Sequence, residues 1–186
     1  MQGAEGKQQC DDADALRRIA RGDLTRFDAF VGRYRARVTS YVFHRVGDLH
    51  RAEDIAQEAF LRAFRAAADG GFRGNGSAAP WLFAIARNCA TDYLRGREAP
   101  AVPLPVEGLA ADGQRRAADE DDPASDLLAA LPEPQRDVVA LKVLCGLTFS
   151  EIAEVMGCPA ETAKSRMRYG LRKLREALSQ QRRGDQ

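Results

Sequence analysis

The chain has 186 residues, of which 45% are hydrophobic and 30% charged, a composition typical of one globular domain or two small ones. Its net charge of +1 excludes a polycation, and no apolar run reaches the roughly 18 residues of a membrane span, so we expect no membrane insertion and a cytoplasmic location. The four cysteines form no CxxC pair, which argues against a disulfide framework or a metal site.

Apolar residues at steps of three and four predict helices in the first half of the chain. After a polar tail over residues 1–22, one apolar stripe predicts a long helix that ends at Gly47. A second helix is expected over about 50–68. A third begins near Pro80, which suits the first turn of a helix because its missing N–H has no partner there. We therefore predict one helical domain over residues 23–97.

The composition changes over residues 98–123, where Ala, Pro, Gly and Asp dominate. This segment is predicted to be a flexible linker, because it has no helical period. It is also acidic, since the chain from Val106 to Asp126 contains seven acidic residues and only two arginines. A second, smaller helical domain is expected over residues 124–180, followed by a polar tail over 181–186. No strand-like alternation is present. The predicted fold is all-α, with two small helical domains joined by a flexible linker.

The second domain contains the spacing of a helix-turn-helix, in the segment LTFSEIAEVMGCPAETAKSRMRYGLRKLREAL. Thr148 can begin a short helix, Gly157 can take the positive φ of a tight turn, and Pro159 opens the next helix. Ala163, six residues after the glycine, is expected to face the first helix. The chain from Glu161 to Arg183 carries eight Lys or Arg and two Glu. A basic helix after such a turn favours DNA reading, whereas the alternative is a solvated helix that packs on the protein itself.

Four motifs, in this order, resemble those of a bacterial RNA polymerase sigma factor of the extracytoplasmic-function (ECF) group in the sigma-70 family: AEDIAQEAFLRAF, FRG…WLFAIARN…D.LR, LPEPQRDVV and GLTFSEIAEVMG…KSR. The resemblance covers about residues 24–97 and 126–178. It implies that residues 23–97 are sigma region 2, which binds core polymerase and recognises and melts the −10 element. It further implies that residues 124–180 are sigma region 4, which reads the −35 element.

The same resemblance implies the partners of the chain. The expected partners are core RNA polymerase through its β′ clamp and β subunit, promoter DNA in double- and single-stranded form, and an anti-sigma factor. No cofactor, metal or catalytic residue is expected, and the chain has no Walker loop, GxGxxG or HExxH motif. A thiol switch is conceivable at Cys89, Cys145 or Cys158, although buried helix cysteines are usually inert.

Matching the motifs residue by residue assigns three candidate sites. The face that meets the β′ clamp comprises Asp54, Gln57 and Glu58, for which an ordinary solvated face is the alternative. The residues that capture a flipped base of the −10 element are Phe72, Arg73, Asn75, Ser77 and Asn88, with Trp81 bracing the loop. The residues that face the −35 element are Thr162, Lys164, Ser165 and Arg168.

Two features leave alternatives open. Phe72 could instead fold back onto the helix that follows its loop. The recognition helix also departs from the common pattern, because Glu161-Thr162-Ala163 replaces GTV and Tyr169-Gly170-Leu171 replaces a basic triplet. Gly170 costs roughly 1 kcal/mol relative to Ala inside a helix. The alternative function is a helix-turn-helix regulator that acts without being a polymerase subunit, which leaves the polar face around Asp54 unexplained.

Overall fold

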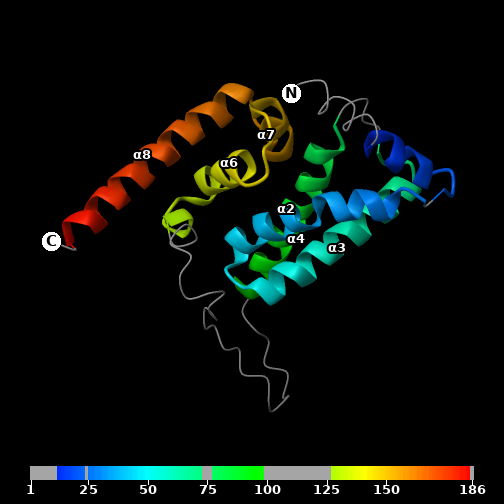
Figure 1. Cartoon of the computed structure of the whole chain (residues 1–186), viewed down its shortest axis with the longest axis horizontal. Helices are drawn as coiled ribbons and strands as arrows, with labels where there is room; N and C mark the ends of the chain where they lie inside the picture. Colours follow the sequence, from blue (N-terminus) through cyan, green and yellow to red (C-terminus); the bar gives the residue numbers. More distant parts are fainter. Residues whose placement is uncertain (1–11, 24, 73–76, 99–126, 185–186) are drawn as a thin grey trace, which may run out of the picture.

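The computed structural model describes residues 12–23, 25–72, 77–98 and 127–184, and within these ranges every regular element is a helix. Residues 12–98 form one helical group, here the N-terminal half, and residues 127–184 form the other, the C-terminal half (Figure 1). This arrangement confirms the predicted all-α fold of two helical domains. The predicted linker lies outside the described residues except for Glu98, which ends a helix.

Three long helices build the N-terminal half: α2 (Phe27–Val46), α3 (Leu49–Ala68) and α4 (Ala78–Glu98). The chain turns between α2 and α3 because Gly47 adopts a φ of 73°, and the carboxylate of Asp48 then caps α3 by accepting from the Arg51 N–H at 3.0 Å. The apolar stripes of all three helices face one another. Their buried members include Phe30, Val38, Tyr41, Val42, Ile55, Phe60, Leu82 and Phe83.

A fourth, short helix over residues 12–19 packs against α2, within the segment expected as a polar tail. Leu16 and Ile19 are buried in the shared core, and Asp12 accepts a hydrogen bond from the Tyr34 hydroxyl at 2.7 Å and from Arg33. The sequence pattern is difficult to read here because two turns of helix offer only a few apolar positions. The N-terminal half is therefore larger than the periodicity predicted.

The C-terminal half comprises a short helix over residues 127–129, then α6 (Glu133–Val143), α7 (Phe149–Met156) and α8 (Ala160–Gly184). Thr148 and Glu151 form a capping box at the start of α7, and Gly157 ends it with a φ of 60°. Ala163 is fully buried, as expected for a small residue where two helices approach. These features confirm the predicted helix-turn-helix, in which α8 is the second helix.

Gly170 lies where α8 crosses α6, and this contact explains why a glycine occupies a helix interior. A Cβ atom at this position would come within 3.1 Å of the Val139 Cγ2 atom and within 3.6 Å of the Gln135 Cβ atom. The helices can therefore approach closely only because residue 170 has no side chain. The local cost in helix propensity is offset by packing between the two helices.

The two halves share one hydrophobic cluster. Helix α7 packs against α4, and α6 packs against α2. Buried side chains of the C-terminal half, such as Leu147 and Ile152, belong to the same cluster as Leu82 and Phe83 of α4. The halves are thus docked on each other through a continuous apolar contact.

Candidate nucleic-acid interface

The exposed face of α3 carries the polar residues expected to bind a protein partner. Asp54 and Gln57 are exposed and Glu58 is half-buried, while Ile55 and Ala59 face the core. Asp54 is 3.7 Å from Arg51, an exposed ion pair that contributes little to stability. These polar groups are therefore available to a partner, which is what a binding face on an otherwise well-packed helix requires.

Arg62 lies on the same polar face of α3, although it is not among the three residues that the motif match assigns to the β′ clamp. Its guanidinium donates to Glu58 at 2.8 Å on α3 and to Asp92 at 3.1 Å on α4. The i,i+4 spacing between Glu58 and Arg62 was a signal that could have indicated the first contact. The second contact joins two helices and becomes visible only in the folded chain.

The aromatic residue at the start of the glycine-rich loop is buried. Phe72 is 7% exposed, and its ring lies edge-on to Trp81 with the centroids 5.2 Å apart. Phe72 thus folds back onto the following helix, which is the alternative that the sequence left open. Its ring does not offer an open stacking surface in this structure, and Trp81 braces it.

Of the other residues expected to contact the −10 element, the structure describes only Ser77 and Asn88. Arg73 and Asn75 lie outside the described residues. The Ser77 hydroxyl accepts a hydrogen bond from the Ala79 N–H at 3.3 Å, so it caps the start of α4. Asn88 is exposed on α4, where its amide faces solvent, and it is flanked by Arg87.

The first turns of α8 present the residues expected to contact duplex DNA. Lys164 and Arg168 are exposed, whereas Thr162 and Ser165 are half-buried. Lys164 is held by Glu161 at 2.6 Å, and the Ser165 hydroxyl donates to the Thr162 carbonyl at 2.9 Å. All four residues lie in the N-terminal part of α8, two of them exposed and two half-buried.

Tyr169, which the sequence marks only as a departure from the common basic triplet, lies in the next turn of α8. Its exposed ring lies 5.5 Å from the guanidinium carbon of Arg168 and 5.1 Å from that of Arg172. Two cations are thereby held on one face of the helix. The aromatic residue that replaces part of a basic triplet in the common pattern thus positions the neighbouring charges.

Among the described residues, no group of three or more His, Cys, Asp and Glu side chains could hold a metal ion. In the same ranges no helix combines the length and the apolar character that crossing a membrane would require.

Two sequence models of one family match the chain, namely Sigma-70 region 2 over residues 30–99 and Sigma-70, region 4 over residues 127–176. The RNA polymerase sigma-H factor of Pseudomonas aeruginosa is 33% identical over 171 residues, which covers 84% of this chain and 88% of that protein. The chain belongs to the sigma-70 family, in its ECF group. The region 2 match covers most of α2 and all of α3 and α4, and the region 4 match covers α6, α7 and most of α8.

Further relatives agree with this placement of the sigma factor. The ECF RNA polymerase sigma-E factor of Escherichia coli K12 is 32% identical over 179 residues, covering 86% of this chain and 90% of that protein. Two solved structures share the fold. The structure of CnrH in complex with the cytosolic domain of CnrY has a TM-score of 0.69 at 20% identity, covering 91% of this chain and 97% of that one. The sigma factor RpoE in complex with the anti-sigma factor NepR from Bartonella quintana has a TM-score of 0.65 at 22% identity, covering 82% and 96%. Members of this family are transcription initiation factors rather than enzymes.

Proposed function

We propose that this sigma factor binds core RNA polymerase, directs it to specific promoters and helps to melt the −10 element. The match of both sigma-70 regions, in order and on one chain, is the observation that carries the proposal. It also favours a cytoplasmic location, because the polymerase and the promoter are there. The chemistry of initiation belongs to the polymerase, so the sigma factor contributes binding, positioning and strand opening.

In this proposal the exposed face of α3 binds the β′ clamp of the polymerase. Asp54 and Gln57 project from the side of α3 opposite its buried stripe, and Glu58 is fixed by Arg62. Two carboxylates and an amide suit a basic and polar partner surface. Because they lie on a rigid helix, little side-chain or backbone ordering opposes binding.

Recognition of the −10 element falls to α4 and the loop before it. Asn88 offers both hydrogen-bond donors and acceptors on an exposed helix face, which a base edge requires. Phe72 and Ser77 hold the two ends of the loop in place rather than contact the base, whereas Arg73, Asn75 and Asn88 supply polar groups for the base and backbone. These groups bind single-stranded DNA, because a base that is stacked within a duplex cannot reach them.

Recognition of the −35 element falls to α8, whose first turns enter the major groove. Thr162 and Ser165 are close to the helix start, where side chains reach base edges, and Lys164 and Arg168 bind phosphates. The similar sigma factor RpoE of Bartonella quintana was solved in complex with the anti-sigma factor NepR. We extend a partner of this kind to the present chain as part of the proposal.

Binding to core polymerase tests the proposal and separates it from the alternative of a regulator that acts alone. Purified Asp54→Arg and Gln57→Ala variants are titrated into core polymerase, and affinity is measured by fluorescence anisotropy. Both substitutions are expected to weaken binding by about fivefold or more, because removing or reversing a polar contact in an interface costs about 1–3 kcal/mol. Asp28→Arg, which reverses an exposed charge on α2, is the matched control and should bind normally.

If the wild-type chain shows no binding to core polymerase, the proposal is contradicted. Equal binding by wild type and both α3 variants would contradict the assignment of the α3 face alone.

A further inference from the structure

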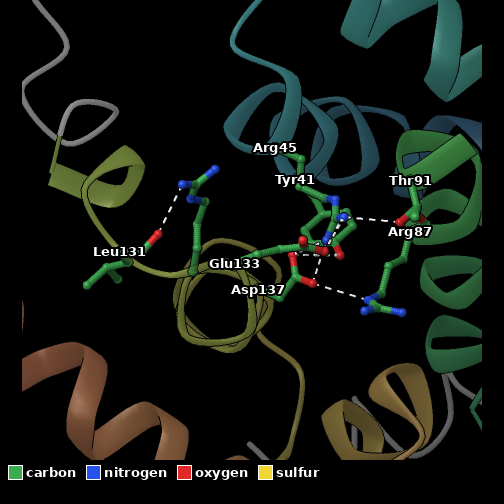
Figure 2. A network of polar contacts seen from close by, with 8 residues as sticks. Tyr41, Arg45, Arg87, Thr91, Leu131, Glu133 and Asp137 are labelled. Atoms are coloured by element: carbon green, nitrogen blue, oxygen red, sulfur yellow. Dashed lines mark hydrogen bonds and ion pairs between the residues drawn. The ribbon is translucent and has the colours of Figure 1, made fainter. Parts of the chain in front are cut away.

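A fully buried carboxylate joins the two regions of this sigma factor. Asp137 lies on α6 of region 4 and has no exposed side-chain surface. Arg45 of α2 donates from one terminal nitrogen to both Asp137 oxygens at 2.5 Å. Arg87 of α4 donates from its Nε at 3.1 Å, and the Tyr41 hydroxyl donates at 3.2 Å. Figure 2 shows these groups converging on Asp137 from α2 and α4.

Within the described residues, the side-chain hydrogen bonds and ion pairs of Asp137 are all made with residues of region 2. Its three donors lie at sequence separations of 96, 92 and 50 residues. Glu133, one turn earlier on α6, adds a second carboxylate on Arg45 at 2.8 Å. The charge of Asp137 is therefore neutralised by the other half of the protein. If region 4 moved away, Asp137 would face water and Arg45 and Arg87 would lose their buried counter-ion.

A second polar contact reinforces the same interface. Arg37 of α2 donates to the backbone carbonyl of Cys145 in region 4, and the Cys145 thiol in turn donates to the Arg37 carbonyl at 3.6 Å. Cys145 is 1% exposed and belongs to the cluster that both regions share. Asp137 on α6 and Cys145 just after α6 thus each form polar contacts with α2.

The docked arrangement does not fit a promoter. The −10 and −35 elements are named by positions about 25 base pairs apart, which is roughly 85 Å of duplex at 3.4 Å per base pair. Helix α7 packs directly against α4, and α8 begins at Ala160, only four residues after α7 ends at Met156. The helix for the −35 element therefore begins beside the helix for the −10 element, whereas promoter binding requires them to be far apart.

The chain is long enough to separate its regions. Residues 99–126 connect them, and 28 extended residues reach at most about 100 Å. The regions can therefore reach both promoter elements once the interface between them opens.

We propose that Asp137, with its partners Arg45 and Arg87, is a latch that holds regions 2 and 4 in a closed, promoter-incompetent form which must open when polymerase binds. This inference rests on the proposed function for its biological meaning, but the latch itself is a property of the free chain. The contact favours the closed form because a buried carboxylate is stable only while the arginines that neutralise it remain in place. Opening then needs a partner, such as core polymerase, that binds the open form better.

The latch also adjoins the proposed −10 surface. Glu133 of region 4 lines the same hollow of about 400 Å³ as Arg87, Asn88 and Arg95 of α4. In the closed form a region 4 carboxylate therefore lines the same hollow as the amide proposed to read the −10 element, and it disfavours a DNA phosphate there by like-charge repulsion. Opening removes this carboxylate and also releases Arg87 from its ion pair with Asp137.

Thiol alkylation of the full chain reports the latch directly. The protein is treated with iodoacetamide, and modification of Cys145 and Cys89 is followed by mass spectrometry of their peptides. Cys145 lies at the interface between the regions, whereas Cys89 is buried within region 2 and serves as an internal control. The variants are Asp137→Asn, Arg87→Gln and the control Glu176→Gln, which removes an exposed carboxylate of α8.

The latch predicts that Asp137→Asn and Arg87→Gln accelerate alkylation of Cys145 by about tenfold, while Cys89 remains protected and Glu176→Gln behaves as wild type. Both latch variants should also bind core polymerase several-fold more tightly. If Asp137→Asn also exposes Cys89, that variant has lost its fold. The test then rests on Arg87→Gln, which changes a partly exposed side chain instead of the buried carboxylate. Unchanged protection of Cys145 in Arg87→Gln would overturn the latch.

The two proposals fail in distinguishable ways. If no variant and no wild-type chain binds polymerase, the proposed function fails, yet the thiol measurement still decides whether the latch exists. If Cys145 becomes reactive while affinity for polymerase stays at the wild-type value, the latch does not oppose polymerase binding and the proposed regulation is wrong.

Discussion

The ring of Phe72 meets the ring of Trp81 edge to face, with centroids 5.2 Å apart. The two residues lie on either side of the glycine-rich loop, so their contact fixes both of its ends. Trp81 is the single tryptophan of the chain, which makes its fluorescence a direct probe of this contact.

Phe72→Ala is expected to lower the free energy of unfolding by about 3 kcal/mol, because it removes a buried aromatic ring and leaves a cavity beside Trp81. Phe72→Leu should cost less than about 1.5 kcal/mol because most of the volume is retained. Urea denaturation followed by tryptophan fluorescence measures both. Leu61→Ala, which truncates a leucine that is 44% exposed, should change stability by less than about 0.5 kcal/mol. A loss for Phe72→Ala no larger than that of Leu61→Ala would mean that the ring is not buried in solution.

Asn88→Ala tests recognition of the −10 element without disturbing the fold. Asn88 is exposed, so the free energy of unfolding should change by less than about 0.5 kcal/mol. Binding to core polymerase should also be unchanged. Permanganate reactivity of thymines in the −10 region should fall about tenfold or more, since one hydrogen-bonding side chain for the captured base is lost. Wild-type reactivity would remove Asn88 from the melting site.

Lys164 and Arg168 are expected to bind phosphates at the −35 element. Alanine at either position should weaken binding to a −35 duplex and lower the slope of log affinity against log salt by about one. The assay is a salt titration of region 4 binding within the polymerase holoenzyme. Arg21→Ala, an exposed arginine of the N-terminal half, should leave the slope unchanged. Glu161→Gln should tighten binding, because it releases Lys164 from its ion pair.

Burial raises the pKa of the Cys145 thiol to about 12 from an ordinary value of 9.0. The closed form therefore favours the neutral thiol. The resulting stabilisation is fully present below pH 9.0 and is lost as the pH rises toward 12. Alkylation of Cys145 should stay slow between about pH 8 and 10 in the folded chain, and in urea it should follow the thiolate of an ordinary cysteine. Equal pH profiles in the two conditions would show that Cys145 is already exposed.

Much of the fold could be predicted from residue spacing. The stripes of α2, α3 and α4 repeat at three and four residues over long runs, and the Gly157 turn with its cap at Thr148 needs only a few neighbouring positions. Local signals of this kind survive in the sequence because each element can be recognised without its neighbours. The helix over residues 12–19 is short enough that its apolar residues form no readable period.

The contacts between the regions could not be predicted. Asp137 stands in a motif, yet its partner Arg45 is 92 residues away, and nothing in the local sequence indicates that this carboxylate is buried. Gly170 is explained only by the approach of Val139 from another helix. The orientation of Phe72 likewise depends on its contact with Trp81. From the sequence alone, an aromatic residue in a polar loop could either bind a ligand or pack into the protein core.

Run-off transcription with purified core polymerase on a pool of genomic fragments tests the central claim most directly. If the chain is a sigma factor, RNA synthesis starts at discrete sites that depend on the added protein, and the mapped starts share one −10 and one −35 sequence. If no start depends on the added protein, the chain does not direct initiation.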